Sequence, residues 1–296
     1  MRGLILCFIS LWLAACGDSV APQGPAYVGQ SQPESRPIYH FAVHPLHNPQ
    51  KLHQIFSPLM RYLDQRVPQA RFELEASSSY AHFEEKLKAG SVEFALPNPY
   101  HAVRAREWRY RVIAKMGNDQ DFRGIFLVRN DSGIKTPADL RGKVVSYPAP
   151  TALAAAMMPQ LYLHNHGLDV NKDIKNSYVG THESSIMNVY LGQSAAGATW
   201  PPPWRVFQRE HPKEAGEMHL AWQTEILVQN AIIVRQDVPA AVADGVREAL
   251  VHMHENPEGR SILAGIETPS MDVADDRSFD KVARFLDEFR AKVRTP

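Results

Sequence analysis

The chain has 296 residues, of which 44% are hydrophobic and 22% charged, an ordinary globular composition that leaves room for two domains. Lys plus Arg number 32 and Asp plus Glu also number 32, so the formal net charge is zero. This balance argues against a polybasic surface for nucleic acid or an anionic membrane. Both cysteines, Cys7 and Cys16, lie in the first 16 residues, so the rest of the chain holds no disulfide, thiolate nucleophile or cysteine metal site.

The N-terminus carries an export signal. A short basic region precedes an apolar run over residues 3–13, which is too short to span a bilayer as a helix. The motif LAAC then ends at Cys16 and matches the bacterial lipobox, so we expect a lipoprotein signal peptide over residues 1–16 with a lipid on the cysteine thiol. The alternative is an ordinary signal peptide cut after Ala15. Residues 17–37 are rich in Pro, Gly, Ser and Gln and predict a flexible tether to a membrane-anchored, extracytoplasmic protein.

From Ile38 onward the chain alternates predicted strands and helices. The predicted strands cover residues 38–43, 71–76, 92–96, 110–115, 124–129, 143–147, 177–179, 195–199, 219–222 and 231–234. The predicted helices cover residues 49–63, 80–89, 99–107, 136–140, 152–166, 184–191, 240–255, 257–264 and 278–293. This alternation predicts an α/β fold with largely parallel sheets.

Motifs for catalysis are missing from the sequence. It contains no GxSxG, HExxH, Walker loop or GxGxxG, and no carboxylate pair at a spacing typical of acid–base catalysis. We therefore expect a protein that is not an enzyme and needs no cofactor. His44 and His47 follow a predicted strand end, where a structural role, ligand contact and metal binding are all open; we predict no metal site.

Polar residues follow four predicted strands, at positions where ligands of open α/β sheets bind. These junctions are residues 77–80, 97–101, 148–151 and 180–185. Each puts hydroxyl, amide or imidazole groups beside free N–H groups of a helix start, which suits an anion. Helix capping alone explains any one junction, whereas four of them favour a binding site.

Several segments are together typical of one protein family. They are residues 41–43, 58–63, 86–95, 98–99, 131–135, 139–144, 180–185 and 234–239. Through them the chain, from about Tyr39 to Phe289, resembles the phosphate/phosphite/phosphonate solute-binding proteins of ABC importers. That family has the type II periplasmic-binding-protein fold, and this chain resembles a lipoprotein member.

The resemblance implies two α/β lobes, each a mostly parallel sheet flanked by helices, joined by two crossover strands. The chain would leave the first lobe near Asn130 and return near Val228. Lobe one is then expected over residues 38–130 plus 229–296, and lobe two over residues 131–228. A monomer of this kind would close by a hinge on a small anion, such as a phosphonate, phosphite, phosphate or phosphate ester, and deliver it to an ABC permease.

The sequence departs from the family pattern at three places. The phosphonate branch starts its long helix with a Ser-Thr-Ser-Gly run, of which only the hydroxyl of Thr151 remains here. His101 stands where the branch has a serine, and Trp200 stands where it has an acidic residue that holds an amine-bearing ligand. Tyr80 and His182 match the family.

These departures remove hydroxyl donors and add aromatic surface. A small, doubly charged oxyanion needs many directed donors, so the changes favour a ligand with an apolar, aromatic or cationic part. For Trp200 and Trp204, packing against the prolines between them is the alternative. The predicted ligand-binding residues are Tyr80, Asn98, Tyr100, His101, Thr151, Thr181, His182, Trp200 and His44. The alternative function is a ligand-sensing lipoprotein of the same fold that signals to a membrane kinase or cyclase.

Overall fold

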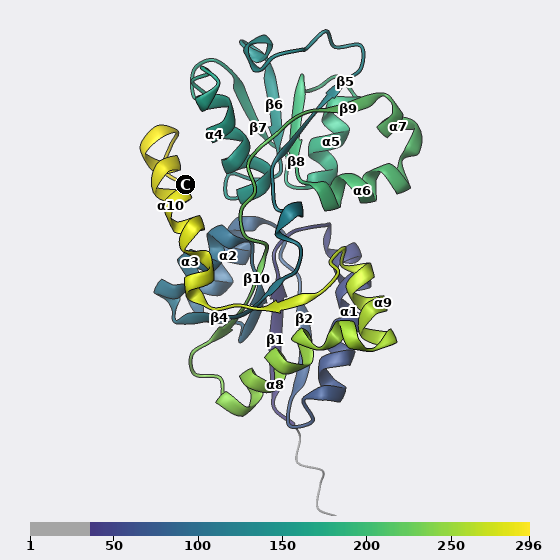
Figure 1. Cartoon of the computed structure of the whole chain (residues 1–296), viewed down its shortest axis with the longest axis vertical. Coiled ribbons are helices and arrows are strands. Elements are labelled where there is room, and N and C mark those ends of the chain that lie inside the picture. The colour runs from purple at the N-terminus through teal and green to yellow at the C-terminus, as the bar shows by residue number, and fades with distance from the viewer. Residues whose placement is uncertain (1–35) are drawn as a thin grey trace, which may run out of the picture. The chain divides into compact units, whose positions relative to one another are not determined.

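Two mixed β-sheets organise residues 36–296, the part of the chain that the computed structural model describes (Figure 1). The first sheet has the order β11-β4-β10-β3-β1-β2, formed by β1 (Ile38–Val43), β2 (Arg71–Glu75), β3 (Phe94–Leu96), β4 (Tyr110–Met116), β10 (Ala231–Arg235) and β11 (Met271–Val273). The second has the order β7-β6-β8-β5-β9, formed by β5 (Ile125–Arg129), β6 (Val144–Tyr147), β7 (Lys175–Tyr178), β8 (Ala196–Thr199) and β9 (Met218–Gln223). The first sheet with its helices is lobe one and the second is lobe two, which confirms the predicted α/β fold.

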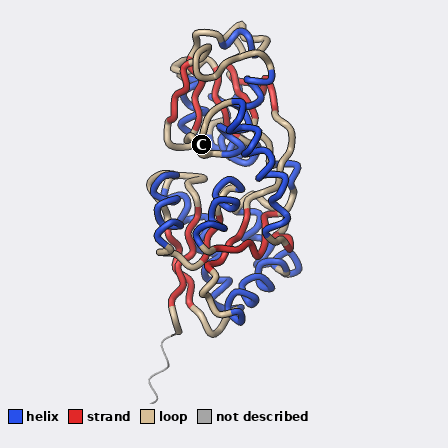
Figure 2. The backbone as a smooth tube through the Cα atoms, turned by 90° about the vertical axis from the view of Figure 1, so that its left-hand side faces the viewer, coloured by secondary structure: helices blue, strands red, loops and turns tan. Residues whose placement is uncertain are grey.

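Helices pack along both sheets (Figure 2). Those connecting strands of lobe one, or following its last strand, are α1 (Pro49–Arg66), α2 (Tyr80–Ala89), α3 (Pro99–Ala105), α8 (Ala240–Val251), α9 (Pro257–Gly265) and α10 (Asp280–Lys292). Those of lobe two are α4 (Met158–Asn165), α5 (His182–Tyr190), α6 (Pro201–Glu210) and α7 (Pro212–Gly216). A π-helical turn, η4 (Leu153–Met157), runs directly into α4.

Each sheet combines parallel and antiparallel pairs. In lobe one β1 pairs in parallel with β2 and β3, whereas β4 runs antiparallel to β10 and β11. In lobe two β6 pairs in parallel with β7 and β8, whereas β5 runs antiparallel to β8 and β9. The sheets, expected to be mostly parallel, are therefore mixed. The first strands after each crossing, β5 and β10, run antiparallel to β8 and β3, which belong to the strand–helix–strand units of their lobes.

The first crossing between the lobes lies earlier than predicted. Ile125 at the start of β5 pairs with Thr199 of β8 and Gln223 of β9, so this strand belongs to lobe two rather than to lobe one. The chain therefore crosses within residues 117–124 and not near Asn130. The sequence could not decide this, because the apolar run of β5 suits the interior of either sheet. The return crossing lies between β9 and β10.

Three helices start with the same Asn-Pro signal. At the starts of α1, α3 and α9, an Asn side chain accepts a hydrogen bond from the backbone N–H three residues later, at 3.0 Å for Asn48, 3.1 Å for Asn98 and 2.8 Å for Asn256. The proline that follows lacks an N–H and has a preset φ, both of which suit the first helical position. Because this cap uses Oδ1, both Nδ2 hydrogens of Asn98 are available to other partners.

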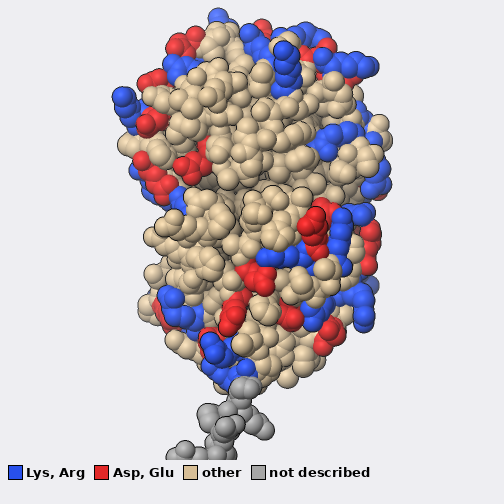
Figure 3. All heavy atoms as spheres, turned by 180° about the vertical axis from the view of Figure 1, so that it is seen from behind, with Lys and Arg blue, Asp and Glu red and all other residues tan. Residues whose placement is uncertain are grey.

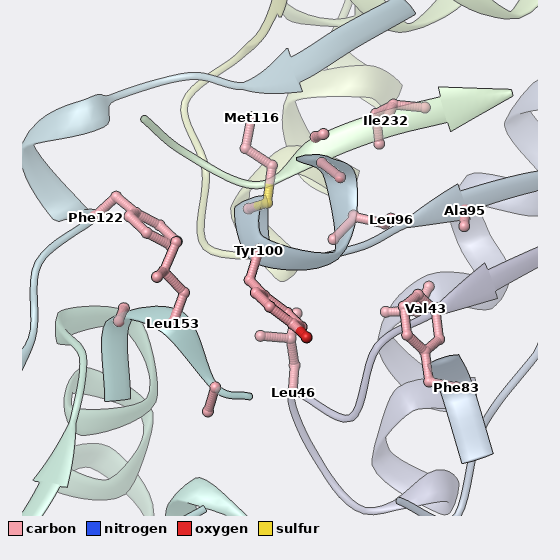
Figure 4. Packing of buried hydrophobic residues seen from close by; sticks show 14 of the residues in the cluster. Val43, Leu46, Phe83, Ala95, Leu96, Tyr100, Met116, Phe122, Leu153 and Ile232 are labelled. Carbon is pink, nitrogen blue, oxygen red and sulfur yellow. The ribbon is translucent and has the colours of Figure 1, made fainter. Parts of the chain in front are cut away.

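A buried apolar cluster extends from lobe one through the first crossing into lobe two (Figure 4). Phe41 and Phe94 stack within lobe one with ring centroids 6.3 Å apart. Phe122 of the crossing and Leu153 at the start of η4 point toward one another in Figure 4. The segment that joins the lobes is thus packed into the core beside the start of the long helix.

The C-terminal segment contacts both lobes. Helix α10 packs against α3 of lobe one and α4 of lobe two. The Asn171 Nδ2 donates to the carbonyl oxygen of Val293 at 2.8 Å, and Arg294 donates to Gln160 Oε1 at 3.1 Å and to the carbonyl oxygen of Pro150 at 2.6 Å. The C-terminal end of the chain, which was predicted to belong to lobe one, is therefore hydrogen-bonded to lobe two.

Charges of both signs are interspersed on the surface that Figure 3 shows, in keeping with the zero net charge. Within residues 36–296 no helix combines the length and the apolar character needed to cross a membrane. The predicted signal peptide, the lipid on Cys16 and the tether up to Ser35 lie outside the described residues.

Gly197 in β8 is expected to be intolerant of a side chain. A Cβ there would lie 2.6 Å from the carbonyl oxygen of Ser185 and 2.6 Å from Val189 Cγ2, which is closer than packed atoms approach. We therefore expect Gly197→Ala to lower the free energy of unfolding by about 1–3 kcal/mol, measured by urea denaturation. Gly216→Ala is the control, because nothing lies within 4 Å of a Cβ at that position. Equal losses in the two variants would contradict the packing argument.

Candidate functional site

A small cavity lies where strand ends of lobe one face helix starts of lobe two. It is lined by His44, Tyr80, Asn98, Phe122, His182, Trp200, Asn230 and residues 152–155. Its volume is about 10 Å³, close to what a single water molecule needs. Among the described residues 36–296, none that lines this cavity carries a charged side chain. Any ligand larger than water must therefore move the two lobes or their side chains apart.

The start of the long helix of lobe two supplies backbone donors. Ala152 is extended, and the first hydrogen bond of the helix runs from Ala156 N to Ala152 O at 2.7 Å. The N–H groups of the next three residues, 153–155, therefore have no partner within the helix, and no side chain caps this end. Free N–H groups and the positive end of the helix dipole favour an anion. The alanines that replace the family's hydroxyl residues leave this backbone open to the cavity.

Tyr80, His182 and Thr199 form a hydrogen-bonded chain across the two lobes. The Tyr80 hydroxyl lies 3.3 Å from His182 Nε2, and His182 Nδ1 lies 3.1 Å from Thr199 Oγ1. Burial raises the pKa of the Tyr80 phenol and lowers the pKa of His182 well below its usual range, so both side chains are neutral at pH 7. Since α2 starts at Tyr80 and α5 starts at His182, the contact between these side chains joins a helix start of lobe one to a helix start of lobe two.

His44 is a second neutral imidazole on the cavity wall. Its Nδ1 lies 2.8 Å from the carbonyl oxygen of Leu96, and its ring meets the Tyr80 ring edge-on at 5.9 Å between centroids. Burial lowers the pKa of His44 to about 3, with smaller contributions from His101 and His47. Within residues 36–296 no group of three or more His, Cys, Asp or Glu side chains is arranged to hold a metal.

Asn98 links the two lobes directly. Its Oδ1 caps α3, and its Nδ2 donates to the carbonyl oxygen of Thr151 at 2.9 Å. Thr151 lies two residues before the uncapped helix start of lobe two. The side chain of Asn98 is 4% exposed and lines the cavity, so its amide faces the same space as the free N–H groups.

Aromatic rings form the apolar wall of the cavity. Trp200 meets Phe122 edge-on with centroids 5.7 Å apart, and its centroid lies 6.5 Å from that of His182. Trp204 instead stacks on Phe207 at 5.8 Å, within a separate cluster of lobe two. Of the two tryptophans, Trp200 therefore reaches the cavity, whereas Trp204 packs in the core.

Five of the nine predicted ligand-binding residues line the cavity, namely Tyr80, Asn98, His182, Trp200 and His44. The other four do not line it. Tyr100 belongs to the apolar cluster of Figure 4, with its ring 4.9 Å from that of His101. His101 is fully buried, with Nδ1 3.1 Å from Asn98 Oδ1. Thr151 takes part through its carbonyl oxygen, and Thr181 caps α5 with its side chain.

Two side chains of the cavity lining were not predicted from the sequence. Phe122 and Asn230 lie in the two crossings between the lobes, whereas residues 152–155 contribute backbone at a helix start that was predicted to carry free N–H groups. No motif marks Phe122 and Asn230, because aromatic and amide residues are common in loops. Their positions next to the crossings are the only signal that the sequence contains.

Ion pairs hold α6 of lobe two against lobe one and the first crossing. Lys51 Nζ lies 2.7 Å from Glu210 Oε1, and Arg205 donates to Asp121 Oδ2 at 2.9 Å and to Glu267 Oε2 at 3.2 Å. These side chains are partly exposed, so each pair stabilises the contact only modestly, by about 1 kcal/mol or less. Together they fix the helix whose N-cap residue is Trp200.

His44→Gln is expected to make the protein less sensitive to acid. The pKa of His44 is about 3 when folded and 6.5 in the ordinary state, so below pH 6.5 the unfolded chain binds a proton that the folded chain does not. The contribution of His44 to the free energy of unfolding is therefore complete above pH 6.5 and falls as the pH drops toward 3. At pH 5 about 2 kcal/mol of it is lost. The loss of unfolding free energy between pH 7.5 and pH 5 should shrink by that amount. Exposed His53→Gln should leave it unchanged, and an equal change in both variants would contradict the assignment.

Known proteins resemble this chain over much of its length. A family model described as "ABC transporter, phosphonate, periplasmic substrate-binding protein" matches residues 41–279. The probable ABC transporter phosphite binding protein PhnD1 of Prochlorococcus marinus is 24% identical over 147 residues, 47% of this chain and 50% of that protein. The tetrathionate sensor histidine kinase TtrS of Salmonella typhimurium is 26% identical over 154 residues, 49% of this chain and 26% of that protein. The matched regions thus span half of the first relative and about a quarter of the second.

Solved structures share the fold. A binding protein component of an ABC phosphonate transporter from Pseudomonas aeruginosa has a TM-score of 0.80 at 15% identity and covers 87% of this chain and 88% of its own. PhnD1 in complex with methylphosphonate has a TM-score of 0.79 at 16% identity and covers 86% and 98%. Proteins of the family that the model describes bind substrates for transport and are not enzymes. The family predicted from the sequence is thereby confirmed: this chain belongs to the periplasmic substrate-binding proteins of phosphonate ABC transporters.

Proposed function

We propose that this protein captures a small phosphorus oxyanion between its two lobes and delivers it to an ABC importer. The observation that carries the proposal is the uncapped helix start at residues 153–155, which opens into a cavity that both lobes line. A buried oxyanion needs free N–H donors next to an enclosed space, whereas an uncharged ligand does not need them. Membership of the phosphonate-binding family supports the same ligand class.

The ligand that fits best is a phosphonate or phosphite without a cationic group. Trp200 and Phe122 supply an apolar face, and no carboxylate among the described residues lines the cavity to hold an amine. Methylphosphonate, the ligand in the PhnD1 structure of similar fold, has this character. An apolar substituent beside the aromatic wall agrees with the loss of hydroxyl donors noted in the sequence.

Thermal denaturation of the purified protein tests this proposal. The probes are phosphate, phosphite, alkyl- and aminoalkylphosphonates, sulfonates, and aromatic or quaternary amines. A ligand that binds only the folded state raises the melting temperature, corresponding to about 2.7 kcal/mol at a hundred times its Kd. We expect phosphite or methylphosphonate to give the largest shift. A shift with aromatic or cationic compounds alone would refute the proposed ligand class.

We also propose that the protein works outside the cytoplasm as a monomer, anchored to a bacterial membrane by a lipid on Cys16. The lipobox ending at that residue supports the anchor. Metabolic labelling with a fatty acid should tag the wild-type protein, which should fractionate with membranes. Cys16→Ser should lose both the label and the membrane association, and a labelled variant would refute the assignment.

A second candidate function is ligand sensing. The similarity to part of the TtrS sensor kinase favours it, since that protein carries a related region within a longer chain. The two functions differ in partner. Stimulation of ATP hydrolysis by a reconstituted permease would support transport, whereas ligand-dependent binding to a membrane kinase would support sensing.

A further inference from the structure

His44 presents one ring nitrogen as a hydrogen-bond acceptor. A carbonyl oxygen only accepts hydrogen bonds, so the 2.8 Å contact with Leu96 O places the proton of the neutral ring on Nδ1. Nε2 then carries a lone pair, and no hydrogen bond to it is formed by residues 36–296. His44 lines the cavity and is 2% exposed, so this lone pair is held in a nearly dry environment.

Four titratable groups face His44. They are His47 on the same loop, His101 of α3, His182 of α5 and Tyr80 of α2. Burial is the main cause that lowers the pKa of all four imidazoles and raises that of the phenol, so these groups are uncharged at neutral pH. An anion in the cavity would therefore meet an acceptor at His44 rather than an imidazolium.

Asn230 presents a second acceptor. Its side chain is 1% exposed and lines the cavity, and its Nδ2 contacts the thioether sulfur of Met116 at 3.6 Å. Because a thioether accepts hydrogen bonds and does not donate them, this contact orients the amide with Oδ1 on the other side. Within the described part of the chain Oδ1 is buried and has no hydrogen-bond partner. A buried carbonyl oxygen without a donor is unfavourable, so a ligand that donates a hydrogen bond to it is favoured.

The cavity thus combines donors and acceptors. Donors come from the N–H groups of residues 153–155, and acceptors come from His44 Nε2 and Asn230 Oδ1. A fully ionised oxyanion offers only lone pairs, which match the donors and repel the acceptors. An oxyanion that keeps one acidic proton matches both sets.

We infer that the site binds its oxyanion in the form that still carries one acidic proton, donated to His44 Nε2 or Asn230 Oδ1, and thereby rejects sulfonates. This inference rests on the proposed function, because it specifies the protonation state of the same ligand. A sulfonate has a similar shape and one negative charge but no acidic proton at neutral pH, so it leaves both acceptors unpaired. Sites built to hydrogen-bond a hydroxyl discriminate strongly against analogues that lack it.

Titration calorimetry of the purified protein with methylphosphonate and methanesulfonate tests the inference. At pH 6 methylphosphonate should bind about 100-fold more tightly than methanesulfonate. Between pH 6 and pH 8.5 the affinity for methylphosphonate should fall, because this ligand loses its second proton. The affinity for methanesulfonate should stay the same. Equal affinities at pH 6, or tighter binding of methylphosphonate at pH 8.5, would overturn the inference.

The pH profile of methanesulfonate identifies where the proton resides. If methanesulfonate also binds more tightly at pH 6, the proton is on a histidine of the protein, and the inference is wrong. Aminomethylphosphonate provides a further test, because its ammonium group is an alternative donor to the same acceptors. Tighter binding of aminomethylphosphonate than of methylphosphonate would show that the acceptors serve an amine and would equally overturn the inference.

Variants separate the two acceptors. Asn230→Leu removes Oδ1 at similar volume and should narrow the preference for methylphosphonate over methanesulfonate to less than about tenfold. His44→Phe is the second variant, and the exposed His53→Gln is the control. An unchanged preference in both folded variants would overturn the inference, and the wild-type comparison decides it if neither variant folds. If methylphosphonate, phosphite and methanesulfonate all fail to bind, the proposed function fails and the inference with it. If all bind equally, only the inference fails.

Discussion

Replacing Leu153 by proline is expected to weaken oxyanion binding by about 10- to 100-fold. Leu153 is the first residue of the helix, and its N–H is one of the free donors at the cavity. Proline removes that donor and breaks no hydrogen bond within the helix, because the first intrahelical bond starts at Ala156. A hydrogen bond to a charged group contributes about 1.5–3 kcal/mol, which corresponds to the expected loss.

The helix itself should survive this change. Ala152 has φ −72° and ψ 96°, an extended conformation of the kind that precedes proline. Leu153→Ala is the matched control, since both variants lose the buried leucine side chain and only the proline variant loses the N–H. Methylphosphonate affinity should be measured by calorimetry below the melting temperature of both variants. Equal affinity of the two would mean that the backbone donor does not contact the ligand.

Local signals in the sequence were sufficient for most of the fold. Asn48 and Asn98, each followed by proline, mark helix starts that the structure confirms, and Gly90 ends α2 in the left-handed conformation at φ 63°. Caps and turn glycines act through their own backbone geometry, so a single sequence reveals them. The segments typical of the family then supplied the two-lobed arrangement.

Features that depend on distant partners were missed. No helix was predicted at α6, although its three successive prolines occupy the first turn, where no N–H is needed. The short strand β11 was also missed, since it pairs at the edge of lobe one with β4. The assignment of β5 to lobe one failed for the same reason, because its partners are far away in the sequence.

The site was predicted at the level of junctions rather than atoms. All four polar junctions contribute, but at Thr151 the carbonyl oxygen takes part and at Thr181 the hydroxyl only caps a helix. Residue type cannot tell whether a hydroxyl faces a ligand or its own backbone. The absence of hydroxyl residues after Thr151 looked like a loss of donors, whereas the backbone N–H groups of residues 153–155 remain open to the cavity.

An uncharged cavity suits a ligand that must be released. A buried arginine would hold an oxyanion strongly, whereas backbone N–H groups, which carry only partial charges, stabilise its charge only while the lobes enclose it. The bonds from Asn98 to Thr151 O and from Tyr80 to His182 connect the lobes at this cavity. Any opening of the lobes would break these contacts and expose the ligand to water, so we expect affinity to depend on closure.

Asn98→Asp is expected to weaken oxyanion binding by about 100-fold. Aspartate caps a helix as well as asparagine does, so the start of α3 should be retained. It replaces the Nδ2 donor, 2.9 Å from Thr151 O, by a carboxylate oxygen, and it introduces a negative charge into a cavity that has none among the described residues. Two like charges about 5 Å apart at an effective dielectric constant of about 20 repel by about 3 kcal/mol, which sets the expected loss.

Two matched variants separate charge from capping. Asn48→Asp makes the same change at the equivalent cap of α1, which is exposed and does not line the cavity, so affinity for methylphosphonate should stay within about twofold of wild type. Asn98→Ser keeps a capping oxygen without the charge. Its affinity for methylphosphonate should fall only about tenfold, which corresponds to the loss of one interlobe hydrogen bond. If Asn98→Asp binds as well as Asn98→Ser, the ligand does not carry its negative charge near this residue, and the anion site lies elsewhere.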